Sequence, residues 1–389
     1  MSESSSRRAF LETAAGLTIA ATATPFTASA QLTDAYTGPI EWRNKQPGMH
    51  YRRLGRTGLM ISEVVSGGDP ISSHNYEHLN LALEMGLNYL DMAPSYGSGD
   101  CEIAYGKFLA GSDKRSKVFL QTKVSTYGGV RNKLYKQIFD ELPSDKQQAI
   151  MARVQDIRSN NLAEKPGYYI TYFPGQHNQF ADSYLSSAMM PQYGDRVETR
   201  AELRQCIIDS LEGSLKRVNT DHFDLMMCPH GANIADEMDS PMIYDTFLEL
   251  KKQGKVRFLG VTSHNDPAAT LRKAVQLGHY DAVQMAYNVV NGGYVDQAIL
   301  EASAKNIGMI GMKTAHAVAT HHKALQPIPQ WRIDKINRII PGDMKAPLKG
   351  YLWVLQNPHI SAVNSNLWDE TFVRENLALA GQKVDLQPA

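Results

Sequence analysis

Cysteine is scarce in this sequence: 389 residues include three, Cys101, Cys206 and Cys228. Their spacing fits no zinc-binding pattern and their odd number leaves at least one unpaired, so neither a zinc finger nor a disulfide framework is expected. An excess of charge is also lacking, since 40 Lys and Arg residues balance 40 Asp and Glu residues. A chain without net charge has no electrostatic reason to bind nucleic acid or an anionic membrane, and we exclude nucleic acid as a partner.

The weakly apolar stretch near the N-terminus, rich in Ala and Thr, is too short and too polar for a stable membrane span. Arg7 and Arg8 precede it and Ala28-Ser29-Ala30 ends it. This is the three-part pattern of an export signal with an A-x-A cleavage site. Ser6-Arg7-Arg8-Ala9-Phe10-Leu11 resembles the twin-arginine motif. We therefore predict that residues 1–30 are a signal peptide, that the twin-arginine (Tat) export machinery is a partner, and that the folded chain reaches the periplasm or the cell exterior.

Two kinds of segment alternate along the mature chain. Residues 31–48 contain Pro39 and Pro47 and show no periodicity, so we interpret them as a linker. A short hairpin with its turn at residues 56–58 follows, and residues 49–389 are expected to form one domain. Bare apolar runs, typical of buried parallel strands, then alternate with segments of helical period. The predicted strands are residues 59–68, 87–93, 117–124, 222–228, 255–263, 281–290, 307–314 and 360–367.

Eight strand–helix units after a hairpin indicate an α/β fold of the (β/α)8 TIM-barrel class. The alternative is an open, doubly wound sheet. It has less support, because no G-x-G-x-x-G follows the first predicted strand.

Residues 126–200 interrupt the alternation after the third predicted strand. Connections in such folds are usually about 2–6 residues long. This one contains a helical stretch at 145–162 and an aromatic-rich stretch at 167–185. It leaves the barrel at the face where active sites lie, which favours an active-site lid. A surface elaboration or an oligomer contact is the alternative interpretation.

Four polar side chains stand at or just after the ends of three consecutive predicted strands: Asp91, Tyr96, Lys123 and His230. Strand ends meet at one mouth of a TIM barrel, so these side chains are expected to converge. Each has a role if the reaction is carbonyl reduction. Tyr96 would protonate the oxygen as general acid, with Lys123 stabilising its phenolate. Asp91 would keep Lys123 charged, and His230 would orient the carbonyl.

Several segments together resemble the aldo-keto reductases. "DMAPSYG" (91–97) is similar to the family's D-x-A-x-x-Y-G motif, and "QTKV" (121–124) and His230 are similar to the rest of its catalytic tetrad. "FLGVTSH" (258–264) resembles G-V-S-N, and "QMAYN" (284–288) resembles Q-x-x-Y-N. His230 comes one residue later than in the family pattern, so whether it points into the site depends on the local course of the strand.

The resemblance implies an NADP or NAD cofactor, with NADP the family default. Ser263, His264 and Gln284 would line its nicotinamide end, and Met312 and Lys313 stand where the family supplies a stacking aromatic ring. The basic pair that selects the 2′-phosphate of NADP is not evident near the C-terminus, which weakens the NADP assignment. The remaining residues that the resemblance offers to the nucleotide are Asn364, Ser365, Asn366, Arg374 and Asn376.

These patterns predict an exported NAD(P)-dependent oxidoreductase that interconverts a carbonyl and an alcohol by hydride transfer. The substrate would be a small carbonyl compound, and a sugar or polyol is the candidate for recycling a tightly retained cofactor. A non-catalytic, nucleotide-bound binding or scaffolding protein is the alternative, suggested by the shifted histidine and the missing aromatic ring. A barrel lyase or hydrolase has less support, because no metal-ligand set or nucleophile–base pair is visible, and no metal is expected.

Overall fold

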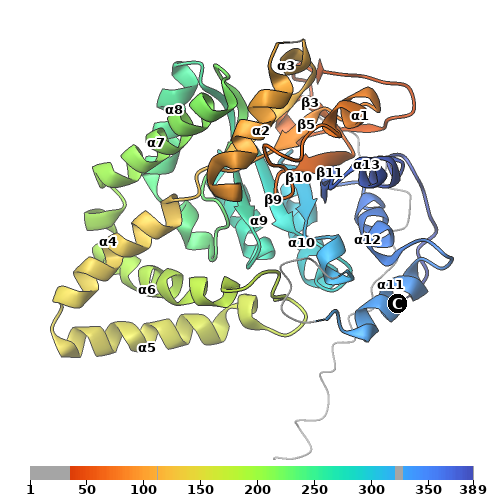
Figure 1. Ribbon diagram of the computed structural model, residues 1–389. Helices are drawn as coiled ribbons and strands as arrows, with labels where there is room; N and C mark the ends of the chain where they lie inside the picture. Colours follow the sequence, from red (N-terminus) through yellow and green to blue (C-terminus); the bar gives the residue numbers. More distant parts are fainter. Residues whose placement is uncertain (1–35, 112, 320–326, 389) are drawn as a thin grey trace, which may run out of the picture.

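The computed structural model describes residues 36–111, 113–319 and 327–388, and the predicted signal peptide lies outside them. Its parallel strands close into an eight-stranded barrel in the order β10-β11-β4-β5-β6-β7-β8-β9. This confirms the predicted (β/α)8 fold (Figure 1). The strands are β4 (Val64–Gly67), β5 (Tyr89–Asp91), β6 (Phe119–Lys123), β7 (Phe223–Met227), β8 (Val256–Ser263), β9 (Ala282–Ala286), β10 (Gly308–Met312) and β11 (Ala362–Asn366).

Helices follow the barrel strands. They are α1 (Leu79–Glu84), α2 (Asp100–Leu109), α3 (Lys114–Lys117), α7 (Ala201–Val218), α8 (Pro241–Lys252), α9 (Pro267–Leu277), α10 (Gly292–Ser303), α11 (Gln330–Ile339), α12 (Ala346–Leu355) and α13 (Glu370–Leu377). Local sequence explains their limits. The Asp369 carboxylate begins α13 by accepting a hydrogen bond from the Thr371 main-chain nitrogen (2.7 Å), and Gly278, in the left-handed conformation with φ of 74°, ends α9.

A three-stranded sheet packs against the barrel ahead of its first strand. It contains β1 (Glu41–Trp42), β2 (Tyr51–Arg53) and β3 (Leu59–Ser62), in the order β1-β3-β2. The segment interpreted as a linker therefore contains a strand. Its side chains make long-range ion pairs that no local pattern reveals: Glu41 pairs with Arg257 of β8. From this sheet Leu59 and Ile61 pack against side chains inside the barrel.

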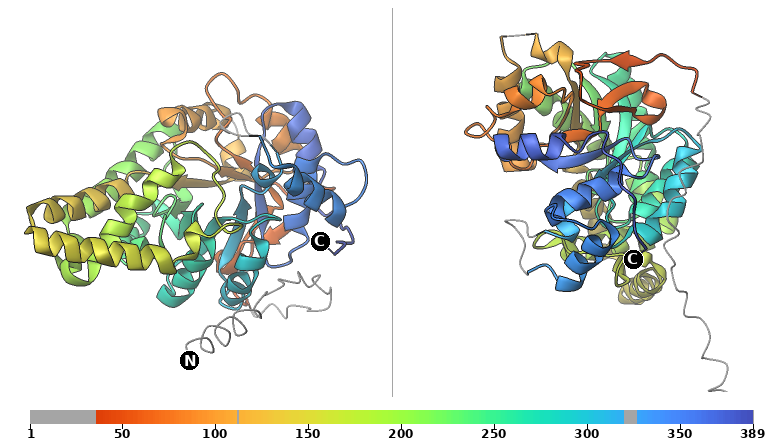
Figure 2. Two further views of the ribbon diagram at one scale, coloured as in Figure 1. Left: turned by 90° about the horizontal axis from the view of Figure 1, so that it is seen from below. Right: turned by 90° about the vertical axis from the view of Figure 1, so that its right-hand side faces the viewer.

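The insertion, residues 126–200, lies between β6 and α7. It contains α4 (Tyr127–Glu141), α5 (Ser144–Asn160), α6 (Gln179–Val197) and two short 3-10 segments, η3 (Leu162–Glu164) and η4 (Gln176–Asn178). Its long helices project from one side of the barrel (Figures 1 and 2). The loop between α5 and α6 returns to the barrel, where the Tyr168 hydroxyl donates to the Asp266 carboxylate (2.5 Å) and Gln176 Nε2 donates to Asn265 Oδ1 (2.7 Å).

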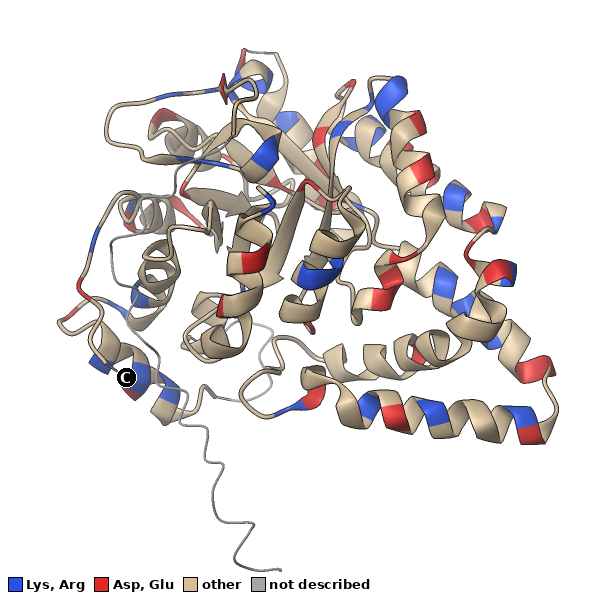
Figure 3. Ribbon diagram, turned by 180° about the vertical axis from the view of Figure 1, so that it is seen from behind, with Lys and Arg blue, Asp and Glu red and all other residues tan. Residues whose placement is uncertain are grey.

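Charged residues of both signs are interspersed over the molecule, and they alternate along the long insertion helix α5 (Figure 3). This distribution agrees with the zero formal charge of the sequence. In the described residues, no helix combines the length and the apolarity that crossing a membrane requires.

Candidate active site

A buried ion pair lies at the carboxyl ends of two adjacent barrel strands. Asp91 ends β5 and Lys123 ends β6, and each side chain is 1% exposed. Lys123 Nζ donates to Asp91 Oδ1 and to the main-chain oxygen of Met92 (2.9 Å). The carboxylate accepts three further hydrogen bonds, from the amides of Gln121 (2.5 Å), Gln284 (3.0 Å) and Asn364 (2.6 Å). These partners compensate for removing both charges from water and fix the direction of the lysine.

Tyr96 begins a short 3-10 segment, η2 (Tyr96–Gly99), directly beside this pair. Lys123 Nζ lies 4.6 Å from the centroid of the Tyr96 ring, within the range of a cation–π interaction. No hydrogen bond joins the Tyr96 hydroxyl to Nζ, whose described acceptors are Asp91 and Met92. Burial raises the pKa of Tyr96 well above its usual value, and the Asp91 and Asp69 carboxylates add to the rise. The phenol therefore holds its proton at neutral pH.

The close approach of Tyr96 to the strands depends on Gly68, which follows β4. A Cβ atom at Gly68 would lie 2.5 Å from the main-chain oxygen of Asp91, 2.6 Å from Cys101 Sγ and 3.2 Å from Tyr96 Cδ2. These distances are shorter than ordinary van der Waals contacts. A glycine at this position is therefore a requirement of the site.

His230 points toward Tyr96, although it comes one residue later in the sequence than the family pattern places its histidine. The two rings meet edge to face, with centroids 6.0 Å apart. Nδ1 lies 2.7 Å from Ser125 Oγ, which leaves Nε2 for a ligand, as donor or acceptor according to the tautomer. Burial, with Lys123 and Lys313 nearby, lowers the pKa of His230 well below its usual value. The imidazole is therefore neutral at neutral pH.

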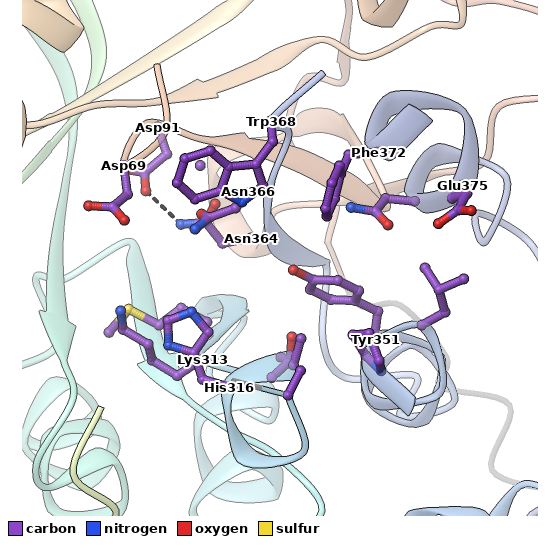
Figure 4. A pocket seen from close by; sticks show the side chains of 18 of the residues that line it. Asp69, Asp91, Lys313, His316, Tyr351, Asn364, Asn366, Trp368, Phe372 and Glu375 are labelled. Atoms are coloured by element: carbon purple, nitrogen blue, oxygen red, sulfur yellow. Dashed lines mark hydrogen bonds between the residues drawn. The ribbon is translucent and has the colours of Figure 1, made fainter. Parts of the chain in front are cut away.

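A cavity of about 720 Å³ opens beside Asp91 and Tyr96, a volume typical of small-molecule sites. Figure 4 shows Asp69 and Asp91 at one end, Lys313 and His316 on one wall, and Tyr351, Phe372 and Glu375 toward the other end. Of the residues predicted from the sequence, those that line the cavity are Asp91, Tyr96, His264, Met312, Lys313, Asn364, Asn366 and Asn376.

Other predicted residues support the cavity or face away from it. Ser263 and Gln284 are buried in the barrel, where Ser263 Oγ donates to the Ala232 main-chain oxygen (2.9 Å) and Gln284 Oε1 accepts from Gln121 Nε2 (2.6 Å). Ser365 Oγ is buried as well, accepting from Asn376 Nδ2 (2.8 Å). The Arg374 side chain is 63% exposed and approaches Glu370. The structure therefore does not bring Ser263, Gln284, Ser365 and Arg374 to the cavity wall, and Lys123 and His230 lie behind Asp91 and Tyr96 without being part of that wall.

The cavity also contains residues that the sequence reading missed: Asp69, His316, Lys345, Tyr351, Trp368, Phe372 and Glu375. A signal existed for Asp69, which follows the glycine pair at the end of a barrel strand. The aromatic residues of the far end stand in or next to helices, where the sequence does not distinguish a cavity wall from a packing surface. In the described residues, no group of three His, Cys, Asp or Glu side chains is placed to bind a metal ion.

The cavity wall offers a ligand an unused hydrogen-bond acceptor. Asn364 Oδ1 is buried without a hydrogen-bond partner in the described part of the chain, and it is left to accept from a ligand. Gly67 keeps the space beside it open, since a Cβ atom there would lie 2.6 Å from Asn364 Oδ1 and 3.0 Å from Asn366 Oδ1. Met312 and Lys313, which stand where the resemblance predicts a stacking ring, both line the cavity, and the Met312 sulfur is a polarisable contact for a flat ring.

A parallel barrel with polar side chains gathered at the carboxyl ends of its strands has the layout of a TIM-barrel enzyme. The model of the Aldo/keto reductase family matches residues 66–332. The chain therefore belongs to the aldo/keto reductase family, whose members are oxidoreductases.

Individual relatives are distant. The chain is 24% identical over 229 residues to aldo-keto reductase AFTS1 of Alternaria alternata, covering 55% of this chain and 49% of that protein. It is 27% identical over 222 residues to the uncharacterized oxidoreductase YrpG of Bacillus subtilis, covering 54% and 48%. The chain thus spans about half the length of the curated relatives it matches. Among solved structures, the holo form of aldo-keto reductase AKR11C1 from Bacillus halodurans shares the fold with a TM-score of 0.55 at 17% identity, over 86% of this chain and 92% of that one.

Proposed function

We propose that the chain is an exported NAD(P)-dependent oxidoreductase that interconverts a carbonyl and an alcohol, with Tyr96 as general acid/base. The observation that carries this proposal is the meeting of Asp91, Tyr96, Lys123 and His230 at one mouth of the barrel, with Asp91 and Tyr96 in the wall of a cavity of about 720 Å³. The export part of the proposal rests on the sequence of residues 1–30 alone.

In the direction of reduction, a nicotinamide nucleotide supplies the hydride when it is bound. The Tyr96 hydroxyl then gives its proton to the carbonyl oxygen, which becomes the alcohol. Lys123, 4.6 Å from the ring centroid, stabilises the phenolate that remains. Asp91 pairs with the lysine and holds it in place, and His230 Nε2 hydrogen-bonds the reacting oxygen. In the direction of oxidation the phenol has to ionise first, which its raised pKa opposes at neutral pH, and the phenolate then takes up the proton of the alcohol.

The residues that would hold the nucleotide are those with unused polar atoms or adaptable surfaces in the cavity wall. Asn364 Oδ1 would accept from an amide, and Met312 would contact the flat ring. Asn366 and Asn376 also line the cavity and offer amide groups to the rest of the nucleotide. Because free NAD(P)H has no obvious supply outside the cytoplasm, we propose that the nucleotide is retained and recycled by a second substrate such as a sugar or polyol. Mass spectrometry of protein isolated from the periplasm tests this: protein without nucleotide contradicts retention.

A non-catalytic, nucleotide-bound member of the family is the second candidate. The raised pKa of Tyr96 and the commitment of Lys123 to Asp91 and Met92 favour it, because both oppose ionisation of the phenol.

Tyr96→Phe decides between the two candidates. Turnover is followed by the change in nicotinamide absorbance, with NADH or NADPH for aldehydes, ketones and sugars and with the oxidised nucleotides for polyols. Loss of a general acid is expected to lower turnover by about 10²–10⁴-fold, with nucleotide affinity unchanged. Tyr294→Phe, on a ring that is 44% exposed on α10, is the matched control. Absence of turnover in the unmodified protein across the panel would favour the non-catalytic candidate.

A further inference from the structure

One loop of the insertion reaches the rim of the cavity, although the long helices of the insertion project away from the barrel (Figures 1 and 2). Phe173, in this loop, is half-buried. Its ring meets the His264 ring edge to face, with centroids 5.5 Å apart, and Lys313 Nζ lies 5.8 Å from the Phe173 centroid. His264 and Lys313 line the cavity from the ends of β8 and β10. One side chain of the insertion therefore contacts two residues of the cavity wall.

Hydrogen bonds on both sides of Phe173 fix this loop to the barrel. Tyr172 is buried, and its hydroxyl accepts from Asn288 Nδ2 (2.9 Å) in the loop after β9. The main-chain nitrogen of Tyr172 donates to Oε1 of Gln176 (2.7 Å), whose side chain is also buried. Gln176 and Tyr168 in turn bond to the loop after β8. The position of the Phe173 ring is therefore set by contacts with two barrel loops.

Both partners of Phe173 lie near the centre of the proposed reaction. Burial is the first cause of the lowered pKa values of His230 and His264, and the charge of Lys313 contributes to both. His230 would hydrogen-bond the reacting oxygen, and a cation near it favours the negative charge that hydride transfer builds on that oxygen. Lys313 also has a left-handed backbone conformation, with φ of 57°. A residue other than glycine keeps this conformation only where its surroundings hold it, so the contacts of its side chain matter for its position.

His264 depends on its surroundings in two ways. As a neutral imidazole it has one donor and one acceptor, so the direction of the ring decides which group it presents to a ligand. Burial keeps it neutral by lowering its pKa, and the charge of Lys313 adds to this effect. The other titratable groups that face it are His230, Lys123 and His316. Phe173 packs against the ring from the insertion side, where it fixes the direction of the ring and limits the access of water.

We infer that Phe173 is a positioning residue of the proposed reaction, which holds His264 and Lys313 in the cavity wall and keeps water from both. The inference rests on the proposed function, since these two residues serve the end of the cavity at which that reaction takes place. The insertion then supports the site through one ring on a fixed loop, and movement of its long helices is not required.

Titration of His264 in the purified full chain tests this inference without reference to turnover. The imidazole signals of protein with isotope-labelled histidine are followed by NMR against pH, and His264→Asn identifies the signal of His264. In the unmodified protein we expect this ring to stay neutral down to about pH 5.5, about one unit below the usual midpoint. Phe173→Leu admits water to the ring, so the midpoint should rise by about one pH unit or more toward the usual value of about 6.5.

Nucleotide-dependent turnover of the same variants gives the second measurement. Phe173→Leu should lower kcat by about 10- to 100-fold, the loss that a small misplacement of reacting groups causes, with a smaller change in KM. Phe173→Tyr keeps the ring and should retain most of the turnover and the His264 titration of the unmodified protein. Tyr169→Leu is the matched control and should change neither, because the Tyr169 ring, in the same loop, contacts His177 and Phe180 within the insertion.

The outcomes separate this inference from the proposed function. An unchanged His264 titration or an unchanged kcat in Phe173→Leu, or an equal effect of Tyr169→Leu, overturns the role of Phe173 and leaves the reductase in place. Absence of turnover in the unmodified protein overturns the proposed function, whatever the titration shows. Melting temperatures of the variants identify losses caused by unfolding. If Phe173→Leu does not fold, a midpoint near the usual value for His264 in the unmodified protein still overturns the inference.

Discussion

Replacing Asp91 by Asn isolates the part played by the buried ion pair. The substitution keeps the size of the side chain and removes its charge, so no cavity is created. Lys123, 1% exposed, then retains the Met92 main-chain oxygen as an acceptor but loses its carboxylate. Breaking a buried pair in this way costs about 3–5 kcal/mol, because it leaves an uncompensated charge out of water. The new amide nitrogen is a donor and faces the amide donors that formerly bonded to the carboxylate, which destabilises the fold further.

The assay is urea unfolding at neutral pH for Asp91→Asn, for Lys123→Met and for the double variant. We expect Asp91→Asn to lower the free energy of unfolding by about 3–5 kcal/mol, seen as a lower urea midpoint at an unchanged slope. The double variant removes both charges and should be more stable than Asp91→Asn alone, giving a coupling energy of about 2 kcal/mol. Asp113→Asn, which breaks the exposed pair with Lys117, should leave the midpoint unchanged. Losses that simply add in the double variant would refute the reasoning, since the two charges would then be energetically independent.

Three further predictions follow from the described contacts. Burial and the nearby Lys313 lower the pKa values of His230 and His264, so the unfolded chain binds protons that the folded chain does not. In urea unfolding, the free energy of unfolding should therefore decrease as the pH is lowered below about 6.5, by at most about 1.4 kcal/mol per pH unit for each histidine. A free energy of unfolding that does not change with pH contradicts this. Gly68→Ala should destabilise the fold by about 1–3 kcal/mol in urea unfolding. Gly129 occupies an exposed helical position with open space around it, so Gly129→Ala should stabilise the fold by about 0.5–1 kcal/mol in the same assay. Tyr168→Phe removes hydrogen bonds to the loop after β8 and should speed amide exchange in the insertion; unchanged exchange would show that this hydroxyl does not hold the loop.

Topology made Asp91 and Lys123 predictable from the sequence. Both end apolar runs, and in a parallel barrel the carboxyl ends of neighbouring strands lie side by side. Tyr96 and His230 follow such ends by a few residues, so their convergence was also predictable. The pairing of particular atoms was not. Gln284 lies on β9, and its amide is held by Asp91 and Gln121 instead of facing the cavity.

Helix rotation limited the prediction of the far end of the cavity. Consecutive helical residues point about 100° apart, so the choice between Arg374 and Glu375 as the cavity residue depends on how α13 is turned. That rotation is fixed by the packing of Val373 and Leu377, which are buried. The strand β1 was not predicted either, because residues far away in the sequence stabilise it.

The link between the insertion and the loop after β8 has an evolutionary consequence. Asn265 and Asp266 are 2% and 3% exposed, and each has a hydrogen-bond partner in the insertion, Gln176 and Tyr168 respectively. Deleting residues 126–200 would remove one hydrogen-bond partner from each side chain, while Asn265 would keep Asn233 and Asp266 would keep the Ala269 main-chain nitrogen at the start of α9. Gain or loss of the segment is thus expected to change the burial and hydrogen bonding of a strand–helix unit two strands away.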